Sequence, residues 1–185
     1  MTGDVPLSAS EIRSYLFEVG EELRVGEGRH VVVVVGGALL ALRHLRDSTS
    51  DIDSARRIDD ELRVAVEEVG RRHGLAPKWL NDSAAPFLPA TFSEADCEVL
   101  LAHDRLWVLG APLEQVFLMK LYGARTRDID DLVIMWPKCR FESPDQVAVF
   151  FAEAYPHAPD DEFLSQFVGH IAALASGSAA YERGS

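Results

Sequence analysis

Two aspartates separated by one residue, Asp51 and Asp53, are the side chains of this sequence best suited to chemistry. On a strand both point to the same face, while Ile52 between them points into the core. At about 4 Å and an effective dielectric of about 20, two carboxylates repel each other by on the order of 4 kcal/mol. A divalent cation removes this repulsion, and Mg²⁺ commonly takes one or two carboxylates together with substrate phosphates. The pair therefore predicts a site for Mg²⁺ or Mn²⁺.

A second feature upstream of the aspartates is suited to holding phosphates. Five valines, Val31 to Val35, predict a strand buried on both faces, and they end at Gly36-Gly37. Glycine lets the backbone turn sharply and approach a ligand, and residues 38–45 predict a helix directly after the turn, with N-terminal N–H groups that favour anions. A lone Gly-Gly is usually a turn and a lone Asp-x-Asp usually a solvated loop. Combined in one unit, they predict phosphoryl or nucleotidyl transfer.

The order of these motifs, strand, Gly-Gly, helix and Thr-Ser-Asp-Ile-Asp (residues 49–53), resembles the DNA polymerase β-like nucleotidyltransferase superfamily. The likeness is greatest to small bacterial members related to AbiEii-type toxins. It implies metal-dependent transfer of a nucleoside monophosphate from a nucleoside triphosphate (NTP) to an acceptor hydroxyl, with release of pyrophosphate. RNA or a protein would be the acceptor, and a toxin of this type would have a cognate antitoxin protein as a partner.

The resemblance also implies roles for residues around the turn. Gly36 and Gly37 would hold the triphosphate through backbone N–H groups. Three side chains would add contacts: Arg46, Ser48 and Thr49. The superfamily usually places a third carboxylate on a strand beside the Asp-x-Asp strand, and Glu98 and Asp96 are the candidates here. A register shift of one residue decides which face each of them occupies.

Residues 111–132, APLEQVFLMKLYGARTRDIDDL, resemble a second signature of the superfamily: a lysine on a helix, an Arg-x-x-Asp segment, and Asp-Leu opening the next helix. The implied role of Lys120 is contact with the triphosphate, whereas an ordinary helical lysine covers apolar surface with its stem. Asp128 and Asp131 would orient Lys120 or an arginine at the nucleotide, or else favour a helix N-terminus through its dipole. An ion pair between Arg125 and Asp128 is the structural alternative.

The remaining chain predicts an α/β (α+β) fold with a mixed sheet flanked by helices. We expect a nucleotidyltransferase core over residues 1–111, a helical half packed on it over residues 112–176, and a disordered tail over residues 177–185. Local patterns predict a Ser8–Glu11 capping box, a helix over residues 57–73 and a hairpin over residues 97–109. Asn81 and Asp82 either face the active cleft or form a cap or turn.

Composition restricts the partners. A net charge of −12 argues against a general nucleic-acid coat protein. A local basic patch near the motif is compatible with that charge, although the same arginines would also suit solvated helix faces: Arg43, Arg46, Arg56 and Arg57. Cys97 and Cys139 match no zinc-binding spacing. Neither a secretory signal nor a membrane-spanning stretch is visible, so we expect a cytoplasmic protein that is not associated with a membrane.

A non-catalytic nucleotidyltransferase-like module that binds a nucleotide or a protein is the alternative function. The lack of a clear third carboxylate supports it, as does Gly-Gly-Ala in place of the more common Gly-Ser. Catalysis predicts that a third carboxylate converges with Asp51 and Asp53, whereas the binding module predicts only the two aspartates.

Overall fold

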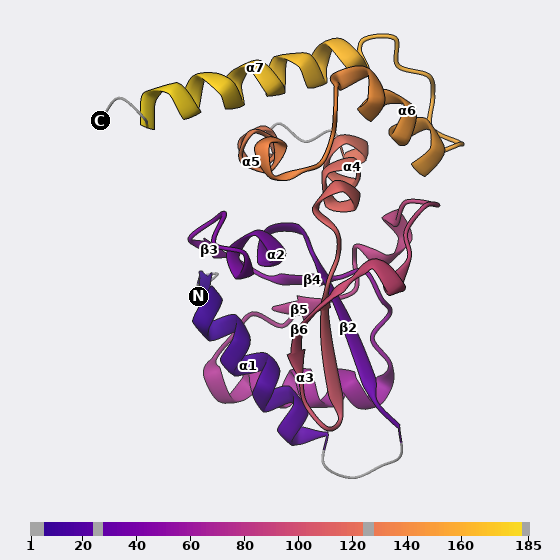
Figure 1. The fold of residues 1–185 in the computed structure, drawn as a ribbon. Helices are drawn as coiled ribbons and strands as arrows, with labels where there is room; N and C mark the ends of the chain where they lie inside the picture. Colours follow the sequence, from indigo (N-terminus) through magenta and orange to yellow (C-terminus); the bar gives the residue numbers. More distant parts are fainter. Residues whose placement is uncertain (1–5, 24–27, 124–127, 183–185) are drawn as a thin grey trace. The chain divides into compact units, whose positions relative to one another are not determined.

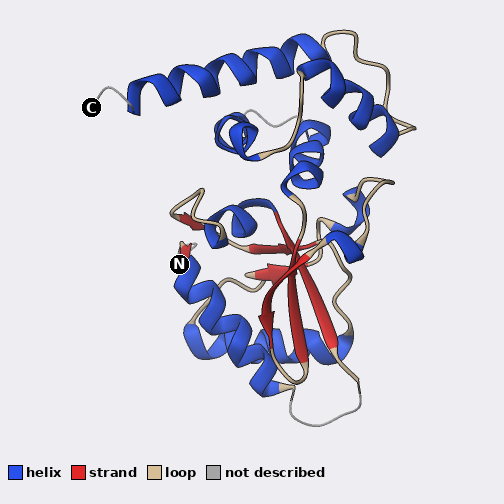
Figure 2. Cartoon of the chain, viewed as in Figure 1, coloured by secondary structure: helices blue, strands red, loops and turns tan. Residues whose placement is uncertain are grey.

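The structure, a computed structural model, describes residues 6–23, 28–123 and 128–182, with side chains as far as residue 177. These residues fall into two compact units (Figure 1). The first lies within residues 1–88 and 93–111, and the second lies within residues 89–92 and 112–185. Helices and a mixed sheet occur together, which confirms the predicted mixed α/β class (Figure 2).

Within the described residues of the first unit, five strands form a mixed sheet in the order β5-β4-β2-β7-β6. Their bounds are β2 (His30–Val35), β4 (Ile52–Ser54), β5 (Leu80–Asn81), β6 (Glu98–Ala102) and β7 (Leu106–Gly110). Central strand β2 is parallel to β7 and antiparallel to β4. The residues Val32–Val35 are at most 2% exposed, which confirms the predicted strand buried on both faces. Strands β6 and β7 form the predicted hairpin.

Three α-helices and a small sheet also lie among the described residues of the first unit, besides short 3₁₀ segments. The helices are α1 (Ala9–Glu22), α2 (Gly36–Leu42) and α3 (Asp60–His73), and the small sheet pairs β1 (Leu7–Ser8) with β3 (Ser48–Thr49). The Ser8 hydroxyl accepts a hydrogen bond from the Glu11 N–H, and the Glu11 carboxylate accepts one from the Ser8 N–H, so the predicted capping box is confirmed. The hydrogen bonds from Ser8 also lower the pKa of Glu11.

Helix α3 begins three residues later than the predicted residue 57. The Asp59 carboxylate accepts a hydrogen bond from the Leu62 N–H and makes Asp59 the N-cap, so the preceding residues are not helical. Gly74, with φ of +64°, ends the helix in the left-handed conformation that glycine adopts without strain. Arg72 of α3 pairs with Glu18 and Glu22, which joins α3 to α1.

The second unit is helical in its described residues. Its helices are α4 (Leu113–Gly123), α5 (Ile129–Met135), α6 (Pro144–Ala154) and α7 (Leu164–Glu182). The fully buried Phe117 of α4 packs against Trp136 and Phe141. Helix α7 runs to Glu182, so residues 177–182 are helical where the sequence predicted a tail without structure. None of the described helices combines the length and apolarity that a membrane span requires.

Candidate functional site

The glycine turn brings the backbone against one of the predicted metal ligands. Val35, the last residue of β2, is the register partner of Asp53 on β4. Gly36 follows with φ of +60°, where residues other than glycine are strained. A Cβ built on Gly36 would lie 3.3 Å from Oδ2 of Asp53. The absent side chain therefore leaves the Gly36 backbone open beside the Asp53 carboxylate.

Gly37 meets two of the predicted nucleotide-binding side chains. A Cβ built on Gly37 would lie 2.8 Å from Oγ1 of Thr49 and 3.2 Å from Nη1 of Arg46. Thr49 is 6% exposed and is held on β3, whose other residue, Ser48, is half-buried. The structure thus gathers the glycine turn, Asp53, Thr49 and Arg46 at one place.

Helix α2 starts at Gly36, two residues earlier than the predicted residue 38, and it ends at Leu42 rather than at residue 45. The earlier end follows from the backbone of His44, whose φ of +58° is left-handed and closes the helix with a turn. Arg46 lies just beyond this turn, and the turn brings its side chain close to Gly37.

Asp51 and Asp53 flank a fully buried residue. Ile52 is 0% exposed, which confirms that it points into the core, and both aspartates are half-buried. Asp53 belongs to β4, whereas Asp51 immediately precedes it and accepts a hydrogen bond from the Ser50 hydroxyl at 3.3 Å. Strand alternation about Ile52 predicts that the two aspartates share the other face, although Asp51 itself lies just outside β4.

A buried serine, which sequence analysis did not single out, fixes the backbone after Asp53. Ser54 is 0% exposed. Its hydroxyl donates to the carbonyl of Arg56 at 2.7 Å and accepts from the N–H groups of Arg56 and Val33 at 3.1 and 3.4 Å. Ser54 therefore ties the end of β4 to β2. A serine directly after an Asp-x-Asp strand, at a core position, is the signal that would have identified it.

The structure does not bring Glu98 to the aspartate pair. Glu98 lies on edge strand β6, which is three strand spacings from β4, or about 14 Å. Its carboxylate pairs with Nη2 of Arg43 at 2.9 Å, and its side chain is 52% exposed. Asp96, the other candidate, lies in a 3₁₀ turn before that strand. The sheet order therefore argues against Glu98 as the third carboxylate beside Asp51 and Asp53, and a role for Asp96 stays a prediction.

The donor set is consistent with one Mg²⁺ or Mn²⁺ that shares its ligands with a nucleotide. Among the described residues, no group of three or more His, Cys, Asp or Glu side chains is arranged to hold a metal ion. Mg²⁺ usually keeps several waters and takes one or two carboxylates plus substrate phosphates. Asp51 and Asp53 provide two carboxylates, and the Cβ-free backbone at Gly36 leaves room for phosphate oxygens beside one of them.

Ion pairs engage two arginines of the predicted basic patch. Arg43 pairs with Glu98, and Arg56 pairs with Glu94 at 2.8 Å. Arg57 is exposed, and Arg46 lies beside Gly37. Because two of the four arginines are paired with glutamates, the net positive charge near the aspartate pair is smaller than the sequence suggests.

In the second unit, Lys120 joins two carboxylates. Its Nζ donates to Oδ1 of Asp128 at 2.8 Å and to Oδ2 of Asp131 at 2.7 Å. The three side chains are only 10%, 15% and 10% exposed, so the stem of Lys120 does not reach out to bulk water. The two aspartates thus orient the ammonium, and its contact with a triphosphate stays a prediction. The alternative partner of Asp128, Arg125, lies outside the described residues.

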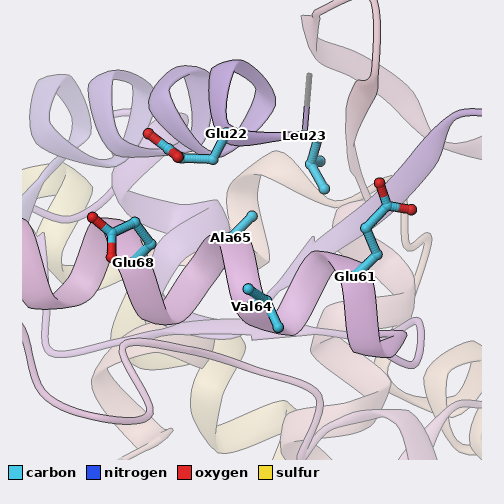
Figure 3. A pocket seen from close by; sticks show the side chains of 6 residues that line it. All are labelled: Glu22, Leu23, Glu61, Val64, Ala65 and Glu68. Atoms are coloured by element: carbon cyan, nitrogen blue, oxygen red, sulfur yellow. The ribbon is translucent and has the colours of Figure 1, made fainter. Parts of the chain in front are cut away.

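A shallow hollow of about 390 Å³ lies between the end of α1 and helix α3 (Figure 3). It is lined by Glu22, Leu23, Glu61, Val64, Ala65 and Glu68. Its three carboxylates are ion-paired with arginines of the same unit: Glu22 with Arg72, Glu61 with Arg105 and Glu68 with Arg71. None of the predicted site residues lines this hollow.

Comparison with known proteins supports the class of function. A family model described as nucleotidyltransferase of unknown function (DUF6036) matches residues 14–135, which is more than half of the chain. The chain belongs to this family. The matched range contains the glycine turn, the Asp51–Asp53 pair and the Lys120 cluster. No curated protein and no solved structure matches the chain.

Proposed function

We propose that the protein is a metal-dependent nucleotidyltransferase of the DNA polymerase β-like kind, similar to AbiEii-type enzymes. It would transfer a nucleoside monophosphate from an NTP to an acceptor hydroxyl of RNA or a protein. The observation that carries this proposal is the convergence of Gly36 with Asp53, and of Gly37 with Thr49 and Arg46, inside the segment that matches the nucleotidyltransferase family.

Each group at this place has a distinct task in the proposal. Asp51 and Asp53 hold Mg²⁺ or Mn²⁺, which when bound neutralises charge on the phosphate oxygens. The backbone N–H groups of the glycine turn bind the triphosphate, and the Arg46 guanidinium adds positive charge that suits phosphate oxygens. Thr49, fixed on β3 and nearly buried, offers a hydroxyl of defined position.

These contacts favour nucleotidyl transfer by positioning. The acceptor hydroxyl oxygen would attack the α-phosphorus in line and lose its proton to solvent. A new oxygen–phosphorus bond would form, and the bond to the pyrophosphate oxygen would break, so that pyrophosphate leaves. Phosphoryl-type transfers need mainly alignment and charge stabilisation. Backbone N–H groups and two metal-binding carboxylates are groups that supply both. The buried Ser54 contributes by fixing the strand that carries Asp53.

The direct test compares label at two positions of the NTP. The protein would be incubated with Mg²⁺, with RNA or protein from a cell lysate as acceptor, and with each of the four NTPs labelled at either the α- or the γ-phosphate. We expect α-label, and not γ-label, to enter the acceptor, and chelation of Mg²⁺ to stop it. Digestion with a nuclease or a protease then identifies the class of acceptor.

Two variants make this test specific. Asp53→Asn should abolish labelling, because it removes one of the two proposed carboxylate ligands. Asp104→Asn is the matched control, since Asp104 is exposed in the turn before β7, at the end of the sheet opposite Gly36. Transfer of γ-label, or equal labelling by the parent and Asp53→Asn, would overturn the proposal.

A non-catalytic module that binds an NTP is the second candidate. Two observations favour it. The register partner of Asp53 on β5 is Asn81, an amide rather than a carboxylate, and the described residues contain no group of three or more His, Cys, Asp or Glu side chains arranged to hold a metal ion, as this candidate predicts. This candidate predicts metal-dependent binding of an NTP at the same residues without incorporation of label into any acceptor.

A further inference from the structure

The strand next to Asp53 presents an amide to it. Strands β4 and β5 are parallel, with Ile52 opposite Leu80 and Asp53 opposite Asn81. Ile52 and Leu80 are buried, whereas Asp53 and Asn81 are both half-buried. Register partners on adjacent strands share a face and lie about 4.8 Å apart. Asn81 is therefore the same-face neighbour of Asp53.

Both polar atoms of the Asn81 side chain are engaged within its own loop. Its Oδ1 accepts from the N–H of Ser83 at 2.9 Å, and its Nδ2 donates to the carbonyl of Lys78 at 3.2 Å. The adjacent carboxylate turns elsewhere, because Oδ2 of Asp82 accepts from the N–H of Ile58 at 3.0 Å. The residue beside Asp53 is thus a neutral amide whose polar atoms are already hydrogen-bonded. The carboxylate of Asp82 instead holds the loop after β4.

We propose that the Asp51–Asp53 site binds a single divalent cation with its nucleotide, and that Asn81 is the residue that limits it to one. This inference rests on the proposed function. A second dication about 3.5–4 Å from the first adds strong repulsion, which bridging carboxylates must offset. Asn81 brings no negative charge to the place where such a carboxylate would stand, and its oxygen already accepts a backbone N–H.

Replacing Asn81 by aspartate would reverse this limit. An aspartate retains the oxygen that accepts from Ser83 but loses the donation to the carbonyl of Lys78. That carbonyl repels the second oxygen, which then supplies a carboxylate one strand spacing from Asp53. Asn81→Asp should therefore admit a second cation. Asn81→Ala is the matched control, because it removes the amide without adding charge and should leave the number of cations at one.

The measurement counts Mn²⁺ bound per chain in the presence of a non-transferable α,β-methylene NTP, with each of the four bases. Electron paramagnetic resonance of the same samples separates an isolated Mn²⁺ from a magnetically coupled pair. The Asp51→Asn, Asp53→Asn double variant gives the background from other acidic groups. We expect one isolated Mn²⁺ above background in the parent and in Asn81→Ala, and a coupled pair in Asn81→Asp.

The outcomes separate this inference from the function beneath it. Two coupled ions in the parent, or a single ion in Asn81→Asp, would overturn the role of Asn81 while leaving the metal-dependent site in place. No Mn²⁺ above background in the parent with any of the four analogues would overturn the proposed function, and the inference with it.

Discussion

Asp51 with Asp53 in the first unit, and Asp128 with Asp131 in the second, are both closely spaced aspartate pairs, but their surroundings differ. Asp128 and Asp131 share the ammonium of Lys120, and all three side chains are at most 15% exposed. Asp51 and Asp53 are half-buried on either side of Ile52, and Asp53 lies beside a glycine turn without side chains. One pair binds a lysine of the chain at 2.8 and 2.7 Å, and the other includes a carboxylate beside the Cβ-free backbone of Gly36.

This difference shows that spacing alone does not identify a ligand site. Removing the lysine from a buried cluster of this kind leaves uncompensated carboxylates, which lowers stability. A pair beside Cβ-free backbone has a different proposed use, because Mg²⁺ takes one or two carboxylates together with substrate phosphates. The comparison predicts different responses to mutation. Mutation of the Lys120 cluster should lower stability, and mutation of the Asp51–Asp53 pair should abolish ligand binding.

The largest effect on stability is expected from Lys120→Met. The substitution leaves two largely buried carboxylates without their shared cation, so the free energy of unfolding should fall by about 3 kcal/mol. Urea denaturation measures this change. Lys138→Met, at an exposed lysine of the same unit, is the control and should change stability by less than about 0.5 kcal/mol.

A second substitution locates the cause of that loss. If unbalanced negative charge is responsible, adding Asp131→Asn to Lys120→Met should restore part of the stability. Equal stability of the parent and Lys120→Met would show that the cluster does not hold α4 and α5 together, and the contrast between the two pairs would fail.

An intermediate effect is expected from Gly37→Ala. The new Cβ would lie 2.8 Å from Oγ1 of Thr49, so the threonine or the turn must shift, at a cost of about 1–3 kcal/mol. Gly123→Ala is the control, because a Cβ there would meet nothing within 4 Å and alanine favours the helix. Both can be measured by urea denaturation. A Gly37→Ala variant that is as stable as the parent would contradict the close approach of the turn to Thr49.

The smallest effect concerns Asp59, an aspartate of the first unit with a local structural role. Burial opposes ionisation, but hydrogen bonds from the N–H of Leu62 and from His30 outweigh it and lower the pKa of Asp59. Its charge therefore contributes stability above the unfolded pKa of about 4, and that contribution is lost as pH falls through the lower folded pKa.

Asp59→Asn isolates this charge, because asparagine is also a good N-cap residue. At about pH 7 the parent should be more stable than Asp59→Asn by less than about 1 kcal/mol, as for other charges at a helix N-terminus. The difference should shrink as pH falls below about 4. Urea denaturation across this range checks both points, and a difference that grows toward low pH would contradict the assignment.

Sequence patterns predicted the local parts of the site well, because they depend on neighbouring residues. The valine run favours a buried strand, Gly36 and Gly37 permit the turn that follows, and Ile52 separates Asp51 from Asp53 by the alternation of a strand. The capping box at Ser8 likewise requires only residues three apart. Strand β2, the turn, β4 and α1 were therefore all predictable.

The parts that depend on strand order were not predictable in this way. The sequence offered Glu98 on a strand beside Asp53, but the sheet places β6 at one edge and β5, with Asn81, next to β4. No local signal reports that order. The run Ala-Ser-Gly-Ser-Ala-Ala after Leu174 also reads as a weakly structured tail, yet its alanines favour helix, and α7 continues through it.

Thermal stability with nucleotides tests the central claim, a metal-dependent NTP site at Asp51 and Asp53, most directly. The parent, Asp53→Asn and Asp104→Asn would each be melted with the four NTPs, with and without Mg²⁺. A ligand at 100-fold its dissociation constant adds about 2.7 kcal/mol, which raises the midpoint of a protein of this size by about 5–10 °C. We expect that rise, with Mg²⁺ only, in the parent and in Asp104→Asn, and none in Asp53→Asn. An equal rise in Asp53→Asn, or none in the parent with any NTP, would contradict the account.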